Sequence, residues 1–293
     1  MKKIINFVYN ATKLVSDEYF LRVIYFLKLK KKLSLTEPKT FTEKIQWLKV
    51  NSRSNLHTIC SDKYAVRKYV EEKIGSEYLI PLLHVYEKPS DIDWASLPLK
   101  FILKCTHGSG TNIISFDKHK LNFFQSEKKL EKWLNYDYSV RTREWQYKNV
   151  PRKIICEKLL VNHEGIVPSD IKIHCFKKMS GDFDYIIQVD TDRFGNHEQG
   201  YFSVDWENLN IGFKTSIVEY RKLNETERPE QLMKLLDLAR KLAEPFCYCR
   251  VDFYLHESAI YFGEITFHHQ SGLSQVSGDW DLRLGEKIDL SLS

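Results

Sequence analysis

Short runs in which apolar and polar residues alternate fill the middle of the chain and predict β-strands. The predicted strands cover residues 101–105, 112–116, 154–160, 170–176 and 184–190. The first two flank the turn-rich sequence THGSGT, so we expect a hairpin with a glycine loop. In 170–176 the alternate positions Asp170, Lys172 and His174 are polar, which predicts a polar face directed toward a cleft.

Apolar residues spaced three or four positions apart predict helices on either side of these strands. The clearest helix is 229–243, where leucines and alanines form one stripe with a proline near each end. A second helix is predicted at 61–74, with Ser61 as its cap and Gly75 at its end. A third is predicted at 126–135.

Two further strand-like runs, 247–255 and 260–267, predict a second hairpin that turns across His256 to Ala259. Helices and strands therefore mix along the chain without strict strand–helix–strand alternation. This order favours an α+β fold over a doubly wound parallel sheet.

Positive charge is concentrated at the N-terminus. The net charge is +5 for 293 residues, but residues 1–35 contain eight Lys or Arg and two acidic residues, so the remainder carries −1. Apolar residues at helical spacing, followed by lysines at 28 and 30–32, indicate a basic amphipathic helix. It could lie on an anionic membrane surface, or pack on the body of the protein with a solvated lysine edge. No basic stripe extends it, so nucleic-acid binding is not expected.

No segment predicts export or membrane insertion. No apolar run reaches the length of a transmembrane helix, and the first residues lack the apolar core and cleavage site of a secretory signal. The six cysteines mostly lie in apolar runs without C-x-x-C spacing, so we interpret them as reduced core thiols. These features predict a cytoplasmic protein, with the basic N-terminal helix available for contact with the inner face of the membrane.

Two acidic residues interrupt the apolar runs of the second hairpin. Asp252 and Glu264 need a partner there, because a charge in an apolar setting is costly unless it is paired or bound to a metal. If a loop of three to five residues joins the strands, the two carboxylates lie close together, which suits Mg²⁺. Arg250 shares the face of Asp252 and could bind a carboxylate or phosphoryl oxygen. The alternative is a structural cluster of these three residues.

A lysine precedes the glycine loop. Lys104 ends a predicted strand directly before His107, Gly108, Ser109 and Gly110. An ammonium beside the backbone N–H groups of such a turn can bind phosphates, although the spacing is not that of a Walker A motif and an ordinary hairpin can also carry glycines. With Lys172 as a second cation, two lysines and two acids could position a metal-bound triphosphate.

A candidate adenine site follows the apolar residues 154–156. A strand that ends between two lobes can offer backbone groups to a purine while apolar side chains sandwich the ring. The residues at this strand end are Glu157, Lys158, Leu159 and Leu160. The same sequence could equally be a strand that runs into a loop.

Seven segments in combination resemble the TupA-like branch of the ATP-grasp superfamily, which is associated with bacterial surface-polysaccharide loci. The segments are EPKTFTEKIQWLK (37–49), DKYAVRKYV (62–70), FILKCTHGSG (101–110), IICEKLL (154–160), DIKIH (170–174), RVDFY (250–254) and GEITFHHQSG (263–272). The resemblance implies two α+β lobes that hold ATP between them. It divides the chain into an N-terminal helical region at 1–95, a small lobe at 96–155 and a large lobe at 156–293.

The resemblance also implies roles for single residues. Lys104 looks like the phosphate-binding lysine before the flexible loop, and Lys172 like its partner from the other lobe. Residues 157–160 look like the adenine hinge, and Glu164 is a candidate for the ribose. The implied ATP-binding residues are Lys104, His107, Gly108, Ser109, Gly110, Glu157, Lys158, Leu159, Leu160, Glu164, Asp170 and Lys172.

Asp252 and Glu264 look like the magnesium carboxylates of the family. Most ATP-grasp enzymes continue E-x-N after the glutamate, whereas this chain has Thr266, which offers only a hydroxyl. The third metal ligand and the number of Mg²⁺ ions therefore stay open. The implied catalytic residues are Arg250, which would stabilise a developing oxyanion, and Lys172.

The activity that the resemblance implies is that of an ATP- and Mg²⁺-dependent carboxylate–amine ligase. A carboxylate would attack the γ-phosphate to give an acylphosphate, and an amine would displace phosphate to form an amide. We expect the acceptor to be a uronic or amino acid in a capsule, O-antigen or teichuronic-type glycan, and a lipid-linked substrate would suit the basic N-terminus. The alternatives are a saccharide kinase, a glycosyltransferase, and a non-catalytic membrane- or nucleic-acid-binding protein.

Overall fold

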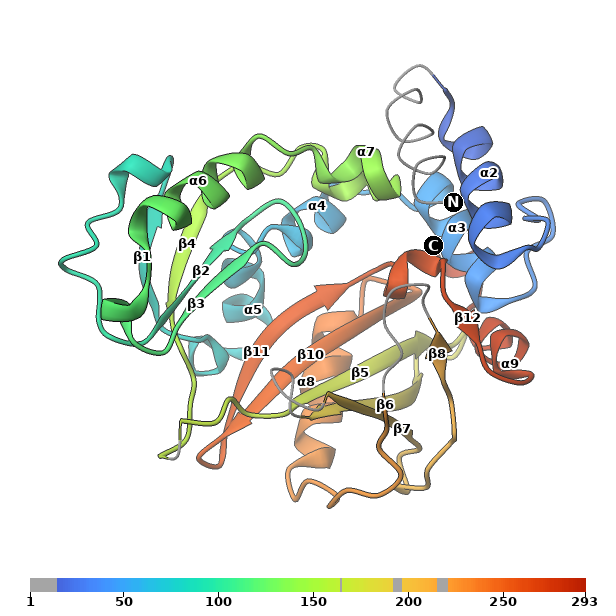
Figure 1. Ribbon diagram of the computed structural model, residues 1–293. Coiled ribbons are helices and arrows are strands. Elements are labelled where there is room, and N and C mark those ends of the chain that lie inside the picture. The colour runs from blue at the N-terminus through green and yellow to red at the C-terminus, as the bar shows by residue number, and fades with distance from the viewer. Residues whose placement is uncertain (1–14, 164, 192–196, 215–220) are drawn as a thin grey trace.

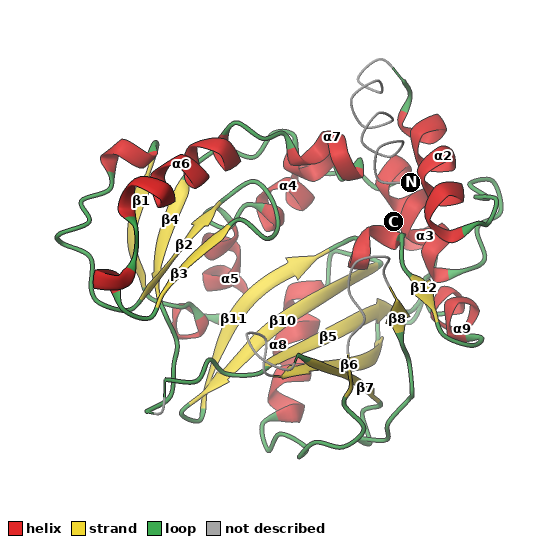
Figure 2. Cartoon of the chain, viewed as in Figure 1, coloured by secondary structure: helices red, strands yellow, loops and turns green. Residues whose placement is uncertain are grey.

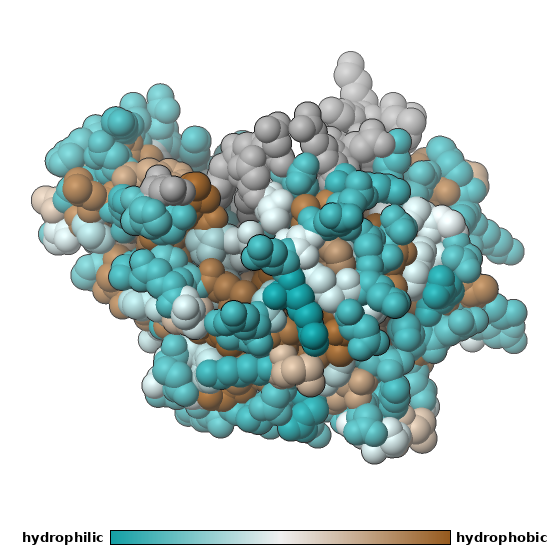
Figure 3. Space-filling view, turned by 90° about the horizontal axis from the view of Figure 1, so that it is seen from below, coloured by the Kyte–Doolittle hydropathy of each residue, from teal (hydrophilic) through white to brown (hydrophobic). Residues whose placement is uncertain are grey.

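The two larger β-sheets of the described residues lie side by side and are flanked by helices (Figures 1 and 2). The computed structural model describes residues 15–163, 165–191, 197–214 and 221–293. Nearly all strand pairs are antiparallel and the helices lie outside the sheets, so the predicted α+β class is confirmed. Seen from below, polar side chains cover most of the surface and apolar ones show between them (Figure 3).

The smaller sheet has four antiparallel strands in the order β1-β4-β2-β3. The strands are β1 (Leu82–Tyr86), β2 (Phe101–Cys105), β3 (Asn112–Ser115) and β4 (Ile154–Lys158). Helix α6 (Phe123–Leu134) covers its outer face, where Leu130 packs against Leu103 and their apolar neighbours. The predicted hairpin with a glycine loop is confirmed, since β2 and β3 pair directly.

The larger sheet has six strands in the order β11-β10-β5-β6-β7-β9, and only β7 and β9 pair in parallel. The strands are β5 (Asp170–Lys177), β6 (Phe183–Thr191), β7 (Glu198–Phe202), β9 (Arg221–Lys222), β10 (Tyr248–His256) and β11 (Ala259–Thr266). One face packs on the helices α4 (Asn55–Ser61), α5 (Val66–Ile74) and α8 (Leu232–Ala243). The other face carries the polar residues of β5 and β10.

The β10–β11 hairpin contains a β-bulge that decides where Glu264 points. The predicted hairpin across His256 to Ala259 is confirmed. Its loop has only two residues, Glu257 and Ser258, both with positive φ, so it is shorter than the three to five residues considered above. Asp252 pairs with Glu264, but Phe253 pairs with Phe262, which leaves Gly263 as an extra residue. In an unbroken ladder Gly263 would face Asp252 and Glu264 would point to the opposite face. The bulge therefore brings both carboxylates to one face.

The predicted helix at 61–74 is divided into α4 and α5. Ser61 ends the first helix instead of capping the second, and the Asp62 side chain accepts a hydrogen bond from the Tyr64 N–H at 2.8 Å, which forms a turn between them. Gly75 ends α5 as predicted, with φ of 112°.

The other two predicted helices begin at different residues from those expected. Helix α6 begins at Phe123 rather than at Ser126, because the Asn122 side chain accepts from the Gln125 N–H at its start. Helix α8 agrees with the prediction of 229–243 from Leu232 onward.

The N-terminal region packs on the body of the protein from residue 17 onward. Helix α2 (Asp17–Leu29) buries Phe20 and Ile24 against α3 (Phe41–Asn51) and its neighbours. Residues 1–14 of the predicted basic helix lie outside the described residues. Among the described residues, no helix is long and apolar enough to span a membrane.

All six cysteines are buried and unpaired, as expected for core thiols. Further short helices and strands complete the fold. They are α7 (Tyr138–Thr142), α9 (Trp280–Glu286) and the two-stranded ladder of β8 (Phe213–Lys214) and β12 (Gln275–Val276). The domain boundaries at 95 and 155 stay predictions; β1 precedes the first boundary and pairs with β4, which crosses the second.

Candidate functional site

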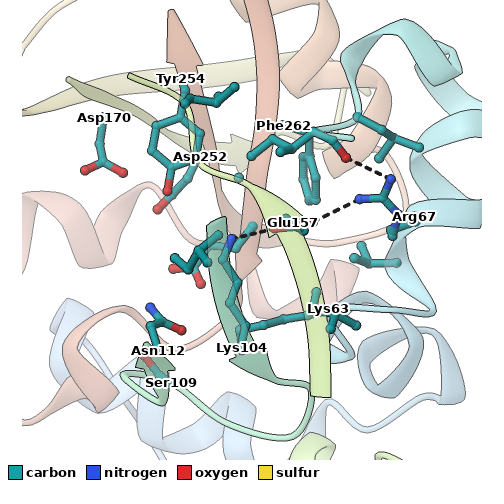
Figure 4. Close-up of a pocket in the computed structure, with 18 of the residues that line it drawn as sticks. Lys63, Arg67, Lys104, Ser109, Asn112, Glu157, Asp170, Asp252, Tyr254 and Phe262 are labelled. Atoms are coloured by element: carbon teal, nitrogen blue, oxygen red, sulfur yellow. Dashed lines mark hydrogen bonds and ion pairs between the residues drawn. The ribbon is translucent and has the colours of Figure 1, made fainter. Parts of the chain in front are cut away.

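A cavity of about 430 Å³ lies between the inner faces of the two sheets (Figure 4). Strands β2 and β4 form one wall, strands β10 and β11 form the opposite wall, and the segment that joins α4 to α5 closes one side. The predicted site residues that line the cavity are Lys104, Ser109, Gly110, Glu157, Lys158, Leu159, Leu160, Asp170, Asp252 and Glu264. Residues more than 150 positions apart thus share one space.

Two cations on the small-sheet side are held by a single carboxylate. Glu157 on β4 accepts from Lys104 Nζ at 2.7 Å and from Arg67 Nη1 at 2.9 Å (Figure 4). Arg67 also donates to the Ile80 carbonyl at 2.9 Å. Because Glu157 is buried, these charge-assisted bonds fix both cations at the cavity wall.

The glycine loop between β2 and β3 is held close to the cavity by a third cation. The ammonium of Lys63 donates to the Gly108 carbonyl, and burial lowers the pKa of this lysine. A side chain at Gly108 would place its Cβ 3.1 Å from the Tyr138 ring, so glycine is needed for this close approach. Ser109 and Gly110 line the cavity beyond it.

His107 is directed away from the cavity. Its Nε2–H points at the carbonyl oxygens of Trp133 (3.1 Å) and Tyr136 (3.2 Å) at the end of α6, and the residue is buried. The structure therefore gives the ring a role in joining the loop to α6, and does not bring it to the predicted cofactor site. Glu164, the candidate for the ribose, lies outside the described residues.

An apolar slot forms one end of the cavity. Leu159 and Leu160 follow β4 and are nearly buried, and Leu79, Ile80, Val167 and Pro168 complete the lining. A flat ring could be held between these side chains. Lys158 lies at the same end, where its backbone N–H donates to the Pro81 carbonyl at 3.0 Å.

Asp252 lies between two cations on the large sheet. Its Oδ1 accepts from Arg250 Nε at 2.6 Å, and its Oδ2 accepts from Arg250 Nη2 at 2.7 Å and from Lys172 Nζ at 3.1 Å. Burial alone would lower the pKa of Arg250, but the neighbouring Asp252 carboxylate outweighs this effect and raises it. The guanidinium therefore stays charged, while burial raises the pKa of the Asp252 carboxyl and Arg250 and Lys172 oppose that rise.

Arg250 joins the members of this cluster together. Its Nη2 reaches Glu264 Oε1 and Thr266 Oγ1, both at 3.1 Å, and its Nη1 donates to His269 Nδ1 at 2.8 Å. Arg250 does not line the cavity and is 8% exposed. The guanidinium lies behind the carboxylates, so in this arrangement it orients them rather than facing a reacting oxygen.

Lys172 does not face the cavity either. Its ammonium is 3.0 Å from Asp170 Oδ1, 3.1 Å from Asp252 Oδ2 and 3.4 Å from Asp190 Oδ2. Burial would lower its pKa, but Asp252 and Asp170 raise it on balance. The polar face expected of β5 exists, yet Lys172 is 2% exposed and lies against carboxylates where a phosphate contact was predicted.

Next to this cluster, buried side chains on the same face of the sheet form a hydrogen-bond network. Gln188 Nε2 donates to Asp190, so its Oε1 accepts from His174 Nε2 at 3.1 Å, and His174 Nδ1 accepts from the Tyr248 hydroxyl at 2.9 Å. Burial lowers the pKa of His174 to about 3, so the imidazole is neutral. The network holds Asp190, and through it Lys172, in place.

Thr266 takes part in the cluster without reaching the cavity. Its hydroxyl accepts from Arg250 and donates to Glu264 Oε1 at 3.2 Å. The proton and one of the two lone pairs of this hydroxyl are therefore used within the cluster. Because Thr266 does not line the cavity, the structure does not bring it to the predicted metal site.

Two cavity residues that the sequence analysis did not assign are Lys63 and Arg67. Lys63 lies in the segment between α4 and α5 and reaches the cavity beside the glycine loop, whereas Arg67 lies in the first turn of α5 and reaches β4. A lysine and an arginine on either side of Val66 are visible in the sequence. The residues that they contact, however, lie 45 and 90 positions away along the chain.

Comparison with known proteins finds one matching family model and several solved structures with low sequence identity. The family model described as TupA-like ATPgrasp matches residues 43–289. A D-alanine–D-alanine ligase from Helicobacter pylori superposes with a TM-score of 0.46 and 14% identity, covering 85% of this chain and 69% of that one. No curated protein sequence matches the chain.

Two further solved structures are more distant. The D-alanine–D-alanine ligase from Bacillus anthracis complexed with ATP has a TM-score of 0.38 and 16% identity, with 71% and 55% of the two chains covered. The phosphoribosylamine–glycine ligase from Thermotoga maritima has a TM-score of 0.39 and 11% identity, with 72% and 48% covered. The chain thus spans roughly half of the length of these two structures.

Proposed function

Because the chain belongs to the TupA-like ATP-grasp family, we propose that it activates a carboxylate with ATP and joins it to an amine during cell-surface polysaccharide biosynthesis. Family membership confirms the predicted ATP-grasp fold and the class of ATP-dependent carboxylate–amine ligase. The saccharide or amino-acid acceptor, the polysaccharide setting and the residue roles below belong to the proposal.

The observation that carries the proposal is the opposition of charges across one cavity. Lys104 and Lys63 lie on one wall beside the glycine loop, and Asp252 and Glu264 lie on the other. The apolar slot at Leu159 suits adenine, which would direct the triphosphate toward the loop and the two acids. Cations on one side and carboxylates on the other are what a metal-bound triphosphate needs.

The acidic wall fits Mg²⁺. This ion prefers oxygen ligands and is commonly held by one or two carboxylates together with substrate phosphates. Among the described residues, no three His, Cys, Asp or Glu side chains converge closely enough to hold a metal ion by themselves, so phosphate oxygens would complete the shell. When bound between Asp252 and Glu264, Mg²⁺ would neutralise charge on the phosphates.

The proposed chemistry has two balanced steps. A carboxylate oxygen of the acceptor forms a bond to the γ-phosphorus as the bond to ADP breaks, which gives an acylphosphate. The amine nitrogen then bonds to the acyl carbon, inorganic phosphate leaves and the nitrogen loses a proton. Lys104 and Lys63 would hold the phosphates, and Arg250 would keep Asp252 and Glu264 in position.

Hydroxylamine trapping tests this proposal. The protein is incubated with Mg-ATP, candidate uronic or amino acids and hydroxylamine, and we expect a hydroxamate together with ADP and phosphate in equal amounts. A sugar phosphate formed without free phosphate would contradict the ligase assignment and indicate a kinase. Failure to bind ATP would contradict the whole proposal.

Replacing Lys104 by Met is expected to weaken ATP binding by about tenfold or more, because one charge-assisted phosphate contact is lost. Isothermal titration with a non-hydrolysable ATP analogue measures the change. Lys100→Met is the matched control, since Lys100 lies on the same segment but is exposed and does not line the cavity. If the two variants bound the ATP analogue with equal affinity, Lys104 would not contact the phosphates.

A further inference from the structure

Six ionisable side chains gather on the inner face of the large sheet, and their formal charges have both signs. The four carboxylates are those of Asp170, Asp190, Asp252 and Glu264, and the two cations are Lys172 and Arg250. In the described structure these groups sum to a charge of −2, which is the charge that one divalent cation balances. Four carboxylates without the two cations could balance two such ions.

Lys172 lies at the centre of three of the carboxylates. Its nitrogen is 3.0 to 3.4 Å from an oxygen of Asp170, Asp252 and Asp190, and the side chain is 2% exposed. These are hydrogen-bond distances, whereas Mg²⁺ requires oxygens at about 2.0–2.1 Å. The three carboxylates are arranged around an ammonium ion. In the part of the chain that the structure describes, no three His, Cys, Asp or Glu side chains converge closely enough to hold a metal ion by themselves.

The oxygens of this group are already used within the protein. Asp190 accepts from Gln188 at 3.1 and 3.2 Å and from Gln199 at 2.8 Å, in addition to Lys172. Asp252 Oδ2 accepts from both Lys172 and Arg250, so its two lone pairs are taken. Oδ1 takes one bond, from Arg250 Nε, and therefore keeps one lone pair for a cation.

We propose that the site binds a single divalent cation, between Asp252 Oδ1 and Glu264, and that Lys172 permanently occupies the place of a second one as a tethered ammonium ion. The inference rests on the proposed function, because the single ion is the one that accompanies ATP. Lys172 is then a positioning residue, which sets the number of metal ions and does not contact the nucleotide. Glu264 lines the cavity with 44% of its side chain exposed, as a residue that receives the ion should.

Native mass spectrometry of the protein with Mn²⁺ and a non-hydrolysable ATP analogue tests this inference by counting ions on each chain. We expect one Mn²⁺ per nucleotide-bound wild-type chain. Lys172→Met should bind two, because Asp170 and Asp190 lose their ammonium partner. Lys172→Arg, which keeps the charge, should return to one.

The stability of Lys172→Met provides a second measurement. Mn²⁺ should raise its melting temperature more than that of the wild type, so the variant remains informative even if it folds only with the metal present. Two ions on the wild-type chain would overturn the inference and leave the proposed function intact. No nucleotide-dependent Mn²⁺ binding would overturn both, and a Lys172→Met protein that binds one ion and gains no stability from Mn²⁺ would overturn the role of Lys172.

Discussion

Asp252→Asn is expected to slow hydroxamate formation by about 10²- to 10³-fold, which corresponds to roughly 3–4 kcal/mol of transition-state stabilisation. The carboxylate lines the cavity and accepts hydrogen bonds from two cations through both oxygens. An amide keeps the shape but loses the charge, and its NH₂ group would face a donor of Arg250 or Lys172. The proposed cation and the side chains of Arg250 and Lys172 therefore lose the carboxylate that all of them contact.

The assay needs a control for the loss of any aspartate. Asp237→Asn is suitable, because Asp237 lies on α8, pairs with exposed Arg240 and Lys241, and is far from the cavity lining. It should leave the rate within about twofold. Circular dichroism checks that both variants fold. An Asp252→Asn enzyme with near wild-type turnover would show that this carboxylate is outside the reaction machinery.

Lys172→Met is expected to lower the free energy of unfolding by about 3–5 kcal/mol when divalent cations are removed with EDTA. The substitution removes the ammonium that three buried carboxylates share, and of the three Asp252 keeps Arg250 as a cationic partner. Urea unfolding measures the loss. The cost arises from the loss of the shared ammonium rather than from lost packing, since methionine has a similar volume.

Two variants separate charge from packing in this experiment. Lys178→Met removes the ammonium of an exposed pair, which lies 2.5 Å from Asp184, and should change the free energy of unfolding far less than Lys172→Met does. Adding Asp190→Asn to Lys172→Met removes one of the unpaired charges and should recover part of the stability. If Lys172→Met were no less stable than Lys178→Met, the buried ion cluster would not support the fold.

Local periodicity is the part of this structure that the sequence determined by itself. Alternation in 170–176 follows from the geometry of one strand, and the stripe of α8 follows from the geometry of one helix, so both could be predicted without any partner segment. The acids within apolar strands, Asp252 and Glu264, could be recognised in the same way because an isolated charge there is costly. The segments that resemble the ATP-grasp family then gave the fold.

The partner of each charged side chain was decided only by the tertiary structure. Lys172 was expected at a phosphate, but the pairing of β5 with β6 and β10 places it among three aspartates. Glu264 reaches the face of Asp252 only because Gly263 forms a bulge, and His107 turns toward α6 because carbonyl oxygens at that helix end are within hydrogen-bond distance of it. Periodicity shows which face a residue occupies, whereas its contacts depend on strand register and on segments distant in sequence, where a shift of one residue reverses the result.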